Sequence, residues 1–139
     1  MLTLGDMLRA SLWSRSLTPE QLRRVEGETL TRQIPAGGLV CRKGEPVEHW
    51  VGVIDGLVKM TNLSADGKPT TFTGLPTGGW FGEGSLLKDE PRRYDVVALR
   101  KSLVAYMPKA TFTRLLDTSI EFNRFLLHQL NERLGQFIA

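Results

Sequence analysis

The pattern of hydrophobic and polar positions changes twice along the chain, and these changes divide it into three parts. In residues 1–28, Thr18 and Gln21 have the spacing of a capping box, and Pro19 occupies the first position of the helix that follows. These features predict a short N-terminal helix that ends near Gly27.

Residues 29–108 consist of short hydrophobic runs that glycine interrupts about once every ten residues. Residues 51–54 and 57–60 are two such runs, and the Asp55-Gly56 pair between them is typical of a tight hairpin turn. Asp66-Gly67 repeats the pattern. Short strands at this spacing, with no helices between them, predict an antiparallel β roll or sandwich.

After Pro108 the spacing becomes helical again. Residues 109–139 predict a short helix from Lys109 to Leu116 and a longer one that begins at Thr118 or Ser119. The longer helix carries one hydrophobic stripe, made of Leu126, Leu127, Leu130, Leu134, Phe137 and Ile138. Packing on the domain's own core and docking on the same helix of a second subunit both account for such a stripe. No repeat, low-complexity tract or linker interrupts the chain, so we expect one domain over residues 1–139.

The composition is that of a soluble globular domain, with 41% hydrophobic and 24% charged residues in a chain of 139. The net charge is +3, but the positive residues are dispersed as short pairs, which argues against a nucleic-acid-binding patch in this segment. The chain has one cysteine, Cys41, and its first residues lack the features of a signal peptide. No hydrophobic run approaches the roughly 20 residues that a membrane span needs. We therefore expect a cytoplasmic protein that does not enter the membrane.

The residues that carry candidate chemistry lie in a glycine-rich stretch in the middle of the predicted β roll. Gly82 and Gly84 flank Glu83, Ser85 follows, and Arg93 comes ten residues after the glutamate. Backbone amides without side-chain cover and an arginine suit the oxygens of a phosphate, and an ionised Glu83 suits a ribose hydroxyl. This combination indicates a binding site for a sugar phosphate.

At this point the chain resembles a known family. Residues 34–37, the turn at residues 42–45, residues 51–60, and Phe81-Gly82-Glu83 followed by Arg93 look like the cyclic-nucleotide-binding fold of Crp/Fnr transcription regulators. The resemblance implies a mainly β double-stranded β-helix (jelly roll), with a short N-terminal helix over 1–28, the roll over 29–108 and C-terminal helices over 109–139.

The same resemblance implies the ligand and the site. It makes the Gly-Glu pair and the arginine a phosphate-binding cassette, and it makes cyclic AMP or cyclic GMP the candidate ligand. We therefore assign the site to Gly82, Glu83, Gly84, Ser85, Arg93 and Tyr94.

Two departures from the family pattern bear on the ligand. Members that bind cyclic AMP usually follow the arginine with serine or threonine and then alanine, whereas this chain has Tyr94 and Asp95. Tyr94 can still donate through its hydroxyl, but we expect Asp95 to repel a phosphate or to pair with Arg92 or Arg93. Phe137-Ile138 stands where the family supplies hydroxyls to the purine. A cyclic nucleotide, another anionic or apolar effector, and a ligand-free structural roll all remain open.

Other chemistries find little support. Cys41, His49 and His128 do not have the spacing of metal ligands, so we expect no metal, haem or iron-sulfur cluster. The sequence offers no nucleophile with a base, no Walker loop and no facing carboxylates, so we expect no enzyme activity. The three tryptophans at 13, 50 and 80 are expected to anchor the core.

The resulting hypothesis is an effector-sensing domain of a Crp/Fnr-type transcription regulator. In full-length members such a domain continues into a dimerisation helix and a helix-turn-helix, so the partners we expect are a small effector, a second subunit, and DNA only through a domain absent from this chain. Because the chain ends inside the dimerisation helix, we expect a weak dimer or none. The alternative is a freestanding module with a vestigial ligand site, whose terminal helix binds another protein. A gene that continues past Ala139 into a helix-turn-helix favours the first reading.

Overall fold

Two helices and a short 3-10 turn precede the roll. The computed structural model describes the backbone of residues 1–63 and 69–138 and the side chains of 1–61 and 74–135, so the predicted Asp66-Gly67 turn lies outside the described residues. Helix α2 (Pro19–Glu28) has the predicted capping box, because Thr18 and Gln21 each accept a hydrogen bond from the other's backbone N–H.

Helix α1 (Leu4–Ala10) was not predicted from the sequence. It begins after Thr3, whose side chain forms a second capping box with Asp6. The 3-10 turn η1 (Leu12–Ser14) joins α1 to the segment before α2 and buries Trp13.

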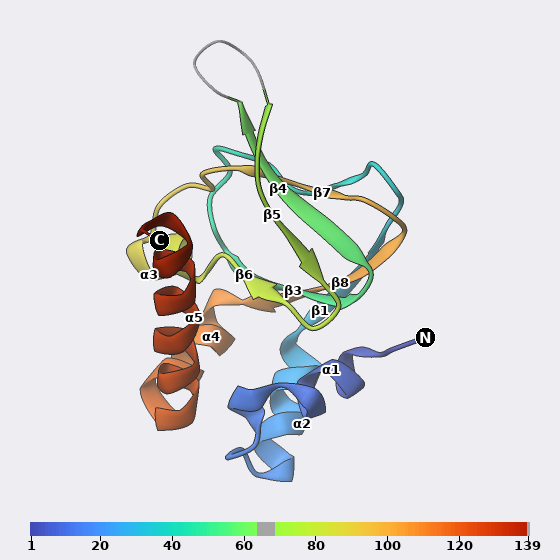
Figure 1. Cartoon of the computed structure of the whole chain (residues 1–139). Helices are drawn as coiled ribbons and strands as arrows, with labels where there is room; N and C mark the ends of the chain where they lie inside the picture. Colours follow the sequence, from blue (N-terminus) through green and yellow to red (C-terminus); the bar gives the residue numbers. More distant parts are fainter. Residues whose placement is uncertain (64–68, 139) are drawn as a thin grey trace.

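The roll is made of two four-stranded antiparallel sheets, which confirms the predicted jelly-roll class (Figure 1). One sheet has the order β1-β8-β3-β6 and the other β2-β7-β4-β5. The strands are β1 (Leu30–Ile34), β2 (Leu39–Cys41), β3 (His49–Asp55), β4 (Leu57–Leu63), β5 (Pro69–Pro76), β6 (Trp80–Phe81), β7 (Asp95–Ala98) and β8 (Ser102–Pro108).

The prediction that residues 51–54 and 57–60 pair with each other as a hairpin is wrong. Strands β3 and β4 do meet at Gly56, which has a positive φ of 148°, but they belong to different sheets. Strand β3 pairs with β8 and β6, whereas β4 pairs with β5 and β7. The turn therefore carries the chain from one sheet to the other, with Ser102 close behind it where a side chain at residue 56 would lie.

The C-terminal helices are α4 (Lys109–Thr118) and α5 (Ile120–Ile138), and α3 (Glu83–Lys88) interrupts the roll between β6 and β7. Helix α5 starts after Ser119, whose hydroxyl accepts a hydrogen bond from the N–H of Phe122 at 3.1 Å. Figure 1 shows α5 standing along one side of the roll beside α3, with α1 and α2 below the sheets. Within the described residues, no helix is long and apolar enough to cross a membrane.

The hydrophobic stripe predicted on α5 is divided between two faces. Leu126 is buried together with Phe122, and both belong to the core under the roll. Leu127 and Leu134, by contrast, are exposed, and so is Ile120 at the start of the helix. One part of the stripe therefore packs on the domain's own core, and the other part is exposed and available for contact with a second subunit.

An aromatic cluster joins the helices to the roll. The rings of Trp50 and Trp80 stack with their centroids 4.3 Å apart, and Trp13 contacts both of them edge-on or tilted at 5.9 Å. Phe122 of α5 meets Trp13 at 5.3 Å and Trp50 at 5.4 Å. This confirms that the tryptophans are core residues, and it places α5 against β3, the strand that pairs with β6 just before Gly82.

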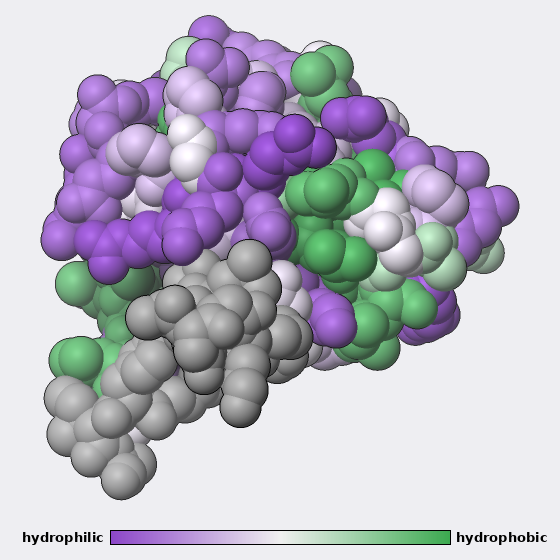
Figure 2. All heavy atoms as spheres, turned by 90° about the horizontal axis from the view of Figure 1, so that it is seen from above, coloured by the Kyte–Doolittle hydropathy of each residue, from purple (hydrophilic) through white to green (hydrophobic). Residues whose placement is uncertain are grey.

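The inside of the roll has its own hydrophobic cluster, which includes Val51, Phe81, Val96 and Val104. On the face that Figure 2 shows, seen from above, hydrophilic residues cover much of the surface, and hydrophobic residues gather to the right of its centre. The roll thus has a hydrophobic core of its own, and Phe81 of this core directly precedes Gly82 of the glycine-rich stretch.

Candidate functional site

The site is built around the turn that follows β6. Gly82 has a positive φ of 93° and caps the start of α3. A Cβ at this position would collide with Nη1 of Arg92, so the guanidinium of Arg92 passes directly over the glycine. Glycine is therefore required here for two reasons, a left-handed backbone and the close approach of an arginine.

Glu83, the next residue, is completely buried and accepts three hydrogen bonds. Its Oε2 accepts from Nε1 of Trp50 at 3.1 Å, and its Oε1 accepts from Nε2 of Gln129 at 2.8 Å and from Nη1 of Arg133 at 2.5 Å. A buried carboxylate needs such partners, because the loss of its water shell costs several kcal/mol or more. The residue that we expected to accept a ribose hydroxyl is thus already held by helix α5.

The same two α5 residues also donate hydrogen bonds to the backbone just before the turn. Arg133 donates through Nη2 to the carbonyl oxygen of Trp80 at 2.7 Å, and Gln129 donates to the same oxygen at 3.2 Å. Sequence analysis missed Gln129 and Arg133, which lie 46 and 50 residues beyond Glu83. The local sequence carried no signal that could pair them with the glutamate.

Arg92 is the arginine that faces this turn. Its side chain is buried, with 7% relative exposure, and its Nη2 donates to the carbonyl oxygen of His49 at 2.9 Å. Its backbone is fixed by 2.8 Å hydrogen bonds to Glu45 and from Gly44. Its Nη1 is buried beside Gly82 and has no hydrogen-bond partner among the described residues. An unpaired buried guanidinium N–H is costly, so this nitrogen is a donor suited to an acceptor from outside the chain.

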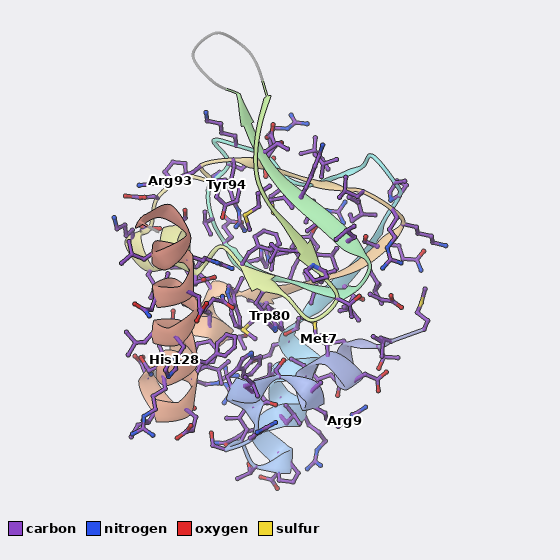
Figure 3. The ribbon with its side chains drawn as sticks, in the orientation of Figure 1. Met7, Arg9, Trp80, Arg93, Tyr94 and His128 are labelled. Atoms are coloured by element: carbon purple, nitrogen blue, oxygen red, sulfur yellow. The ribbon has the colours of Figure 1, made fainter. Side chains whose placement is uncertain are left out.

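Arg93, which we assigned to the site from its spacing, lies elsewhere. Its side chain is 65% exposed and pairs with Glu90 at 3.0 Å. In Figure 3, Arg93 lies at the outer edge of the roll, above the end of α5. Arg92 and Arg93 both precede β7 (Asp95–Ala98) and lie outside any strand, so neither the motif spacing nor strand alternation could choose between the two neighbours.

Tyr94 and Asp95, the two residues that depart from the family pattern, have different surroundings. Asp95 accepts a 2.7 Å hydrogen bond from the backbone N–H of Lys43, and no ion pair joins it to Arg92 or Arg93 in the part of the chain that the structure describes. The expected pairing of Asp95 with an arginine is therefore not found. Tyr94 is half-buried against the core of the roll. Burial raises the pKa of its hydroxyl, while the positive charges of Arg133 and Arg92 oppose the rise.

The remaining assigned residues lie in α3. Gly84 and Ser85 occupy its first turn, half-buried, and the carbonyl oxygen of Ser85 accepts a 3.0 Å hydrogen bond from the N–H of Glu90. The structure thus brings Gly82, Glu83, Gly84, Ser85 and Tyr94 to one end of the roll. Ligand contact by these residues stays a prediction.

The candidate metal ligands do not come together. Among the described residues, no three His, Cys, Asp or Glu side chains are arranged to hold a metal ion. Cys41 is buried in the roll, and burial raises the pKa of its thiol to about 11. A thiol with that pKa is almost entirely protonated near neutral pH and is therefore a weak nucleophile.

Comparison with known proteins identifies the family. Residues 31–119 match the family of the cyclic nucleotide-binding domain. The chain belongs to this family. The match confirms the cyclic-nucleotide-binding fold that the sequence motifs predicted.

Curated relatives come from more than one kind of protein. The chain is 30% identical over 121 residues to the cyclic nucleotide-gated potassium channel mll3241 of Mesorhizobium japonicum, covering 87% of this chain and 32% of the relative. It is 31% identical over 116 residues to a cAMP-dependent protein kinase regulatory subunit of Debaryomyces hansenii, covering 84% of this chain and 25% of the relative. The chain therefore spans between a quarter and a third of these relatives.

Solved structures share the fold. The sensor domain of the transcriptional regulator DNR from Pseudomonas aeruginosa superposes with a TM-score of 0.82 at 23% identity, covering 96% of this chain and 90% of that one. The regulatory domain of Toxoplasma gondii PKA, solved with cAMP, superposes with a TM-score of 0.70 at 26% identity, covering 80% and 42%.

The close approach of Arg92 to Gly82 generates a prediction. Gly82→Ala should lower the free energy of unfolding by about 1–3 kcal/mol, because alanine is strained at positive φ and its Cβ displaces the guanidinium. Gly84→Ala is the matched control, since a Cβ there meets nothing within 4 Å, and it should be neutral or stabilising by up to about 1 kcal/mol. Urea denaturation measures both variants, and equal effects would contradict this account of the turn.

Proposed function

We propose that this domain senses a small anionic effector, which binds to Arg92 and changes the hold of Glu83 on helix α5. The observation that carries the proposal is the buried Nη1 of Arg92, which lies beside Gly82 without a partner among the described residues. Membership of the cyclic nucleotide-binding family supports a cyclic nucleotide, cyclic AMP or cyclic GMP, as one candidate. The unpartnered donor of Arg92 also suits another anionic effector, which is the other candidate.

The electrostatics at Arg92 favour an anion. Its guanidinium is charged at any physiological pH, and burial removes most of the water that would otherwise solvate it. A phosphate oxygen accepting from Nη1 would form a charge-assisted hydrogen bond, which is about twice as strong as a neutral one. Nη2 is already committed to His49, so the orientation of the fork is fixed before any ligand arrives.

Glu83 connects this anion site to α5. A ligand hydroxyl that donates to Glu83 competes with Gln129 and Arg133, and an anion on Arg92 offers Arg133 a second acceptor. Either change weakens the contacts that seat α5 on the turn. By linkage, the effector and the seated position of α5 each alter the stability of the other, which is what a sensor requires.

The outer face of α5 supports contact with a second copy of the chain. Ile120, Leu127 and Leu134 are exposed and follow one another at intervals of seven residues, and half-buried Leu130 lies between the last two. That spacing is typical of the seam between two helices in a coiled coil. We propose that this seam joins two subunits of a Crp/Fnr-type regulator, whose DNA-binding domain would follow α5, and that the domain itself is not an enzyme.

The alternative function rests on the same contacts. Glu83 already has three donors from its own chain, an arrangement that also suits a roll whose ligand site is vestigial and whose α5 binds another protein. The ligand experiment separates the two.

Thermal unfolding with millimolar cyclic AMP, cyclic GMP or inorganic phosphate tests the proposed site. At least one of these should raise the midpoint in the wild type, since a ligand at about 100 times its dissociation constant adds roughly 2.7 kcal/mol. Arg92→Gln should lose the rise because it removes the buried charge. Arg93→Gln is the matched control and should keep it, because that neighbouring side chain is exposed and paired with Glu90.

If Arg93→Gln loses the rise and Arg92→Gln keeps it, the ligand binds Arg93 and the proposed site is wrong. No rise with any of the three probes would favour the vestigial module.

Light scattering tests the seam. The wild-type chain should be mostly monomeric at micromolar concentration and self-associate towards millimolar concentration, because the seam is short. Leu127→Glu should abolish that association by placing a charge in the seam, whereas His128→Glu, one position round the helix, should not. Unchanged association in Leu127→Glu would show that the copies meet elsewhere.

A further inference from the structure

A pocket lies between helix α5, the end of β5 with the start of β6, and the 3-10 turn η1. Its volume is about 550 Å³, within the range of roughly 300–1,000 Å³ that is usual for small-molecule sites. Figure 3 shows two of its lining residues, His128 on α5 and Trp80 at the lower end of the roll. Neither Arg92 nor Glu83 lines it, so this pocket is separate from the proposed anion site.

Each of the three bordering elements contributes an apolar side chain to the pocket. Leu12 of η1 is 60% exposed, whereas Leu75 of β5 and Phe125 of α5 are half-buried, and all three line the pocket. An apolar occupant that covers these side chains removes their exposed surface from water, which is favourable. The body of a ligand that fits this pocket is therefore apolar.

Most of the charged side chains along the pocket are already paired. Arg124 pairs with Glu121 at 3.3 Å, and Arg133 pairs with the buried Glu83. Glu132 also lines the pocket and is exposed, but it forms no ion pair with any residue that the structure describes. After this pairing, the charge that remains for a ligand is the carboxylate of Glu132, which attracts a cation and repels an anion.

We propose that this pocket is a second ligand site, which takes a small amine with an apolar body. The body lies against Leu12, Leu75 and Phe125, and the positively charged nitrogen lies near Glu132. The preference for a cation is the opposite of that proposed for Arg92, so the two sites take different classes of ligand. The inference does not require the Arg92 site to function, because Arg92 does not line the pocket.

Isothermal titration with three probes that share one naphthalene ring tests the inference. Naphthylmethylamine is a cation, naphthylmethanol is uncharged and naphthoate is an anion. The wild type should bind the amine about threefold more tightly than the alcohol, and the alcohol more tightly than naphthoate, because one exposed carboxylate contributes little. Glu132→Gln should remove the difference between amine and alcohol. Glu20→Gln removes an exposed carboxylate outside the pocket and should keep that difference.

A second pair of variants tests the apolar wall. Leu12→Ala should weaken binding of all three probes by about threefold or more, because it removes apolar surface that the ring covers. Leu127→Ala is the matched control, since Leu127 is exposed on α5 but does not line the pocket. All of these variants alter exposed side chains, and circular dichroism checks that each is folded. His128→Gln should leave the order of the three probes unchanged.

Naphthoate binding at least as tight as that of the amine would overturn the inference, and so would failure of all three probes to bind the wild type at millimolar concentration. Equal effects of Leu12→Ala and Leu127→Ala would place the probes elsewhere and also overturn it. Arg92→Gln should bind the amine as the wild type does. Loss of amine binding in that variant would put the amine at the anion site and contradict a second pocket, whereas loss of the phosphate or cyclic nucleotide response alone concerns the proposed function.

Discussion

The buried carboxylate of Glu83 is the interaction on which the arrangement of this domain depends. It has no exposure to solvent, and its three donors come from two other elements: Trp50 in β3, and Gln129 and Arg133 in α5, all of which reach Glu83 at the start of α3. Removing one partner of a buried ion pair costs about 3–5 kcal/mol, because the other charge is left without compensation. The position of α5 is therefore set by polar contacts at its C-terminal half and by Phe122 and Leu126 at its N-terminal half.

The site and the core share residues, which makes the site stiff. Trp50 donates to Glu83 and also stacks on Trp80, whose carbonyl oxygen accepts from Arg133. Gly82, the residue before Glu83, lies directly under the guanidinium of Arg92. A change at Glu83 thus reaches the aromatic cluster and α5 directly, whereas the exposed Arg93 pairs with Glu90 and lies outside this set of contacts.

Local signals in the sequence predicted local structure well. The capping box of Thr18 and Gln21, the jelly-roll class and the buried tryptophans are all confirmed. The strands around Gly56 were placed correctly, but their pairing was not, because residues on either side of a turn do not reveal which sheet each strand joins. Arg93 was assigned from its spacing to Glu83, whereas the structure buries the neighbouring Arg92 over Gly82 and leaves Arg93 exposed, a difference that motif spacing cannot reveal. Gln129 and Arg133 were beyond reach because tertiary packing alone brings them to Glu83.

The central claim is that an effector at Arg92 changes the contacts of Glu83. Heteronuclear NMR of the three indole N–H groups tests it most directly, in titrations with inorganic phosphate and with cyclic AMP. The indole N–H of Trp50 donates to Glu83, whereas Trp13 lies in the same aromatic cluster without that contact and serves as the reference. The account predicts that the Trp50 resonance moves as the effector saturates the wild type, more than that of Trp13, and that it does not move in Arg92→Gln. Saturable binding that depends on Arg92 but leaves the Trp50 resonance in place would contradict it.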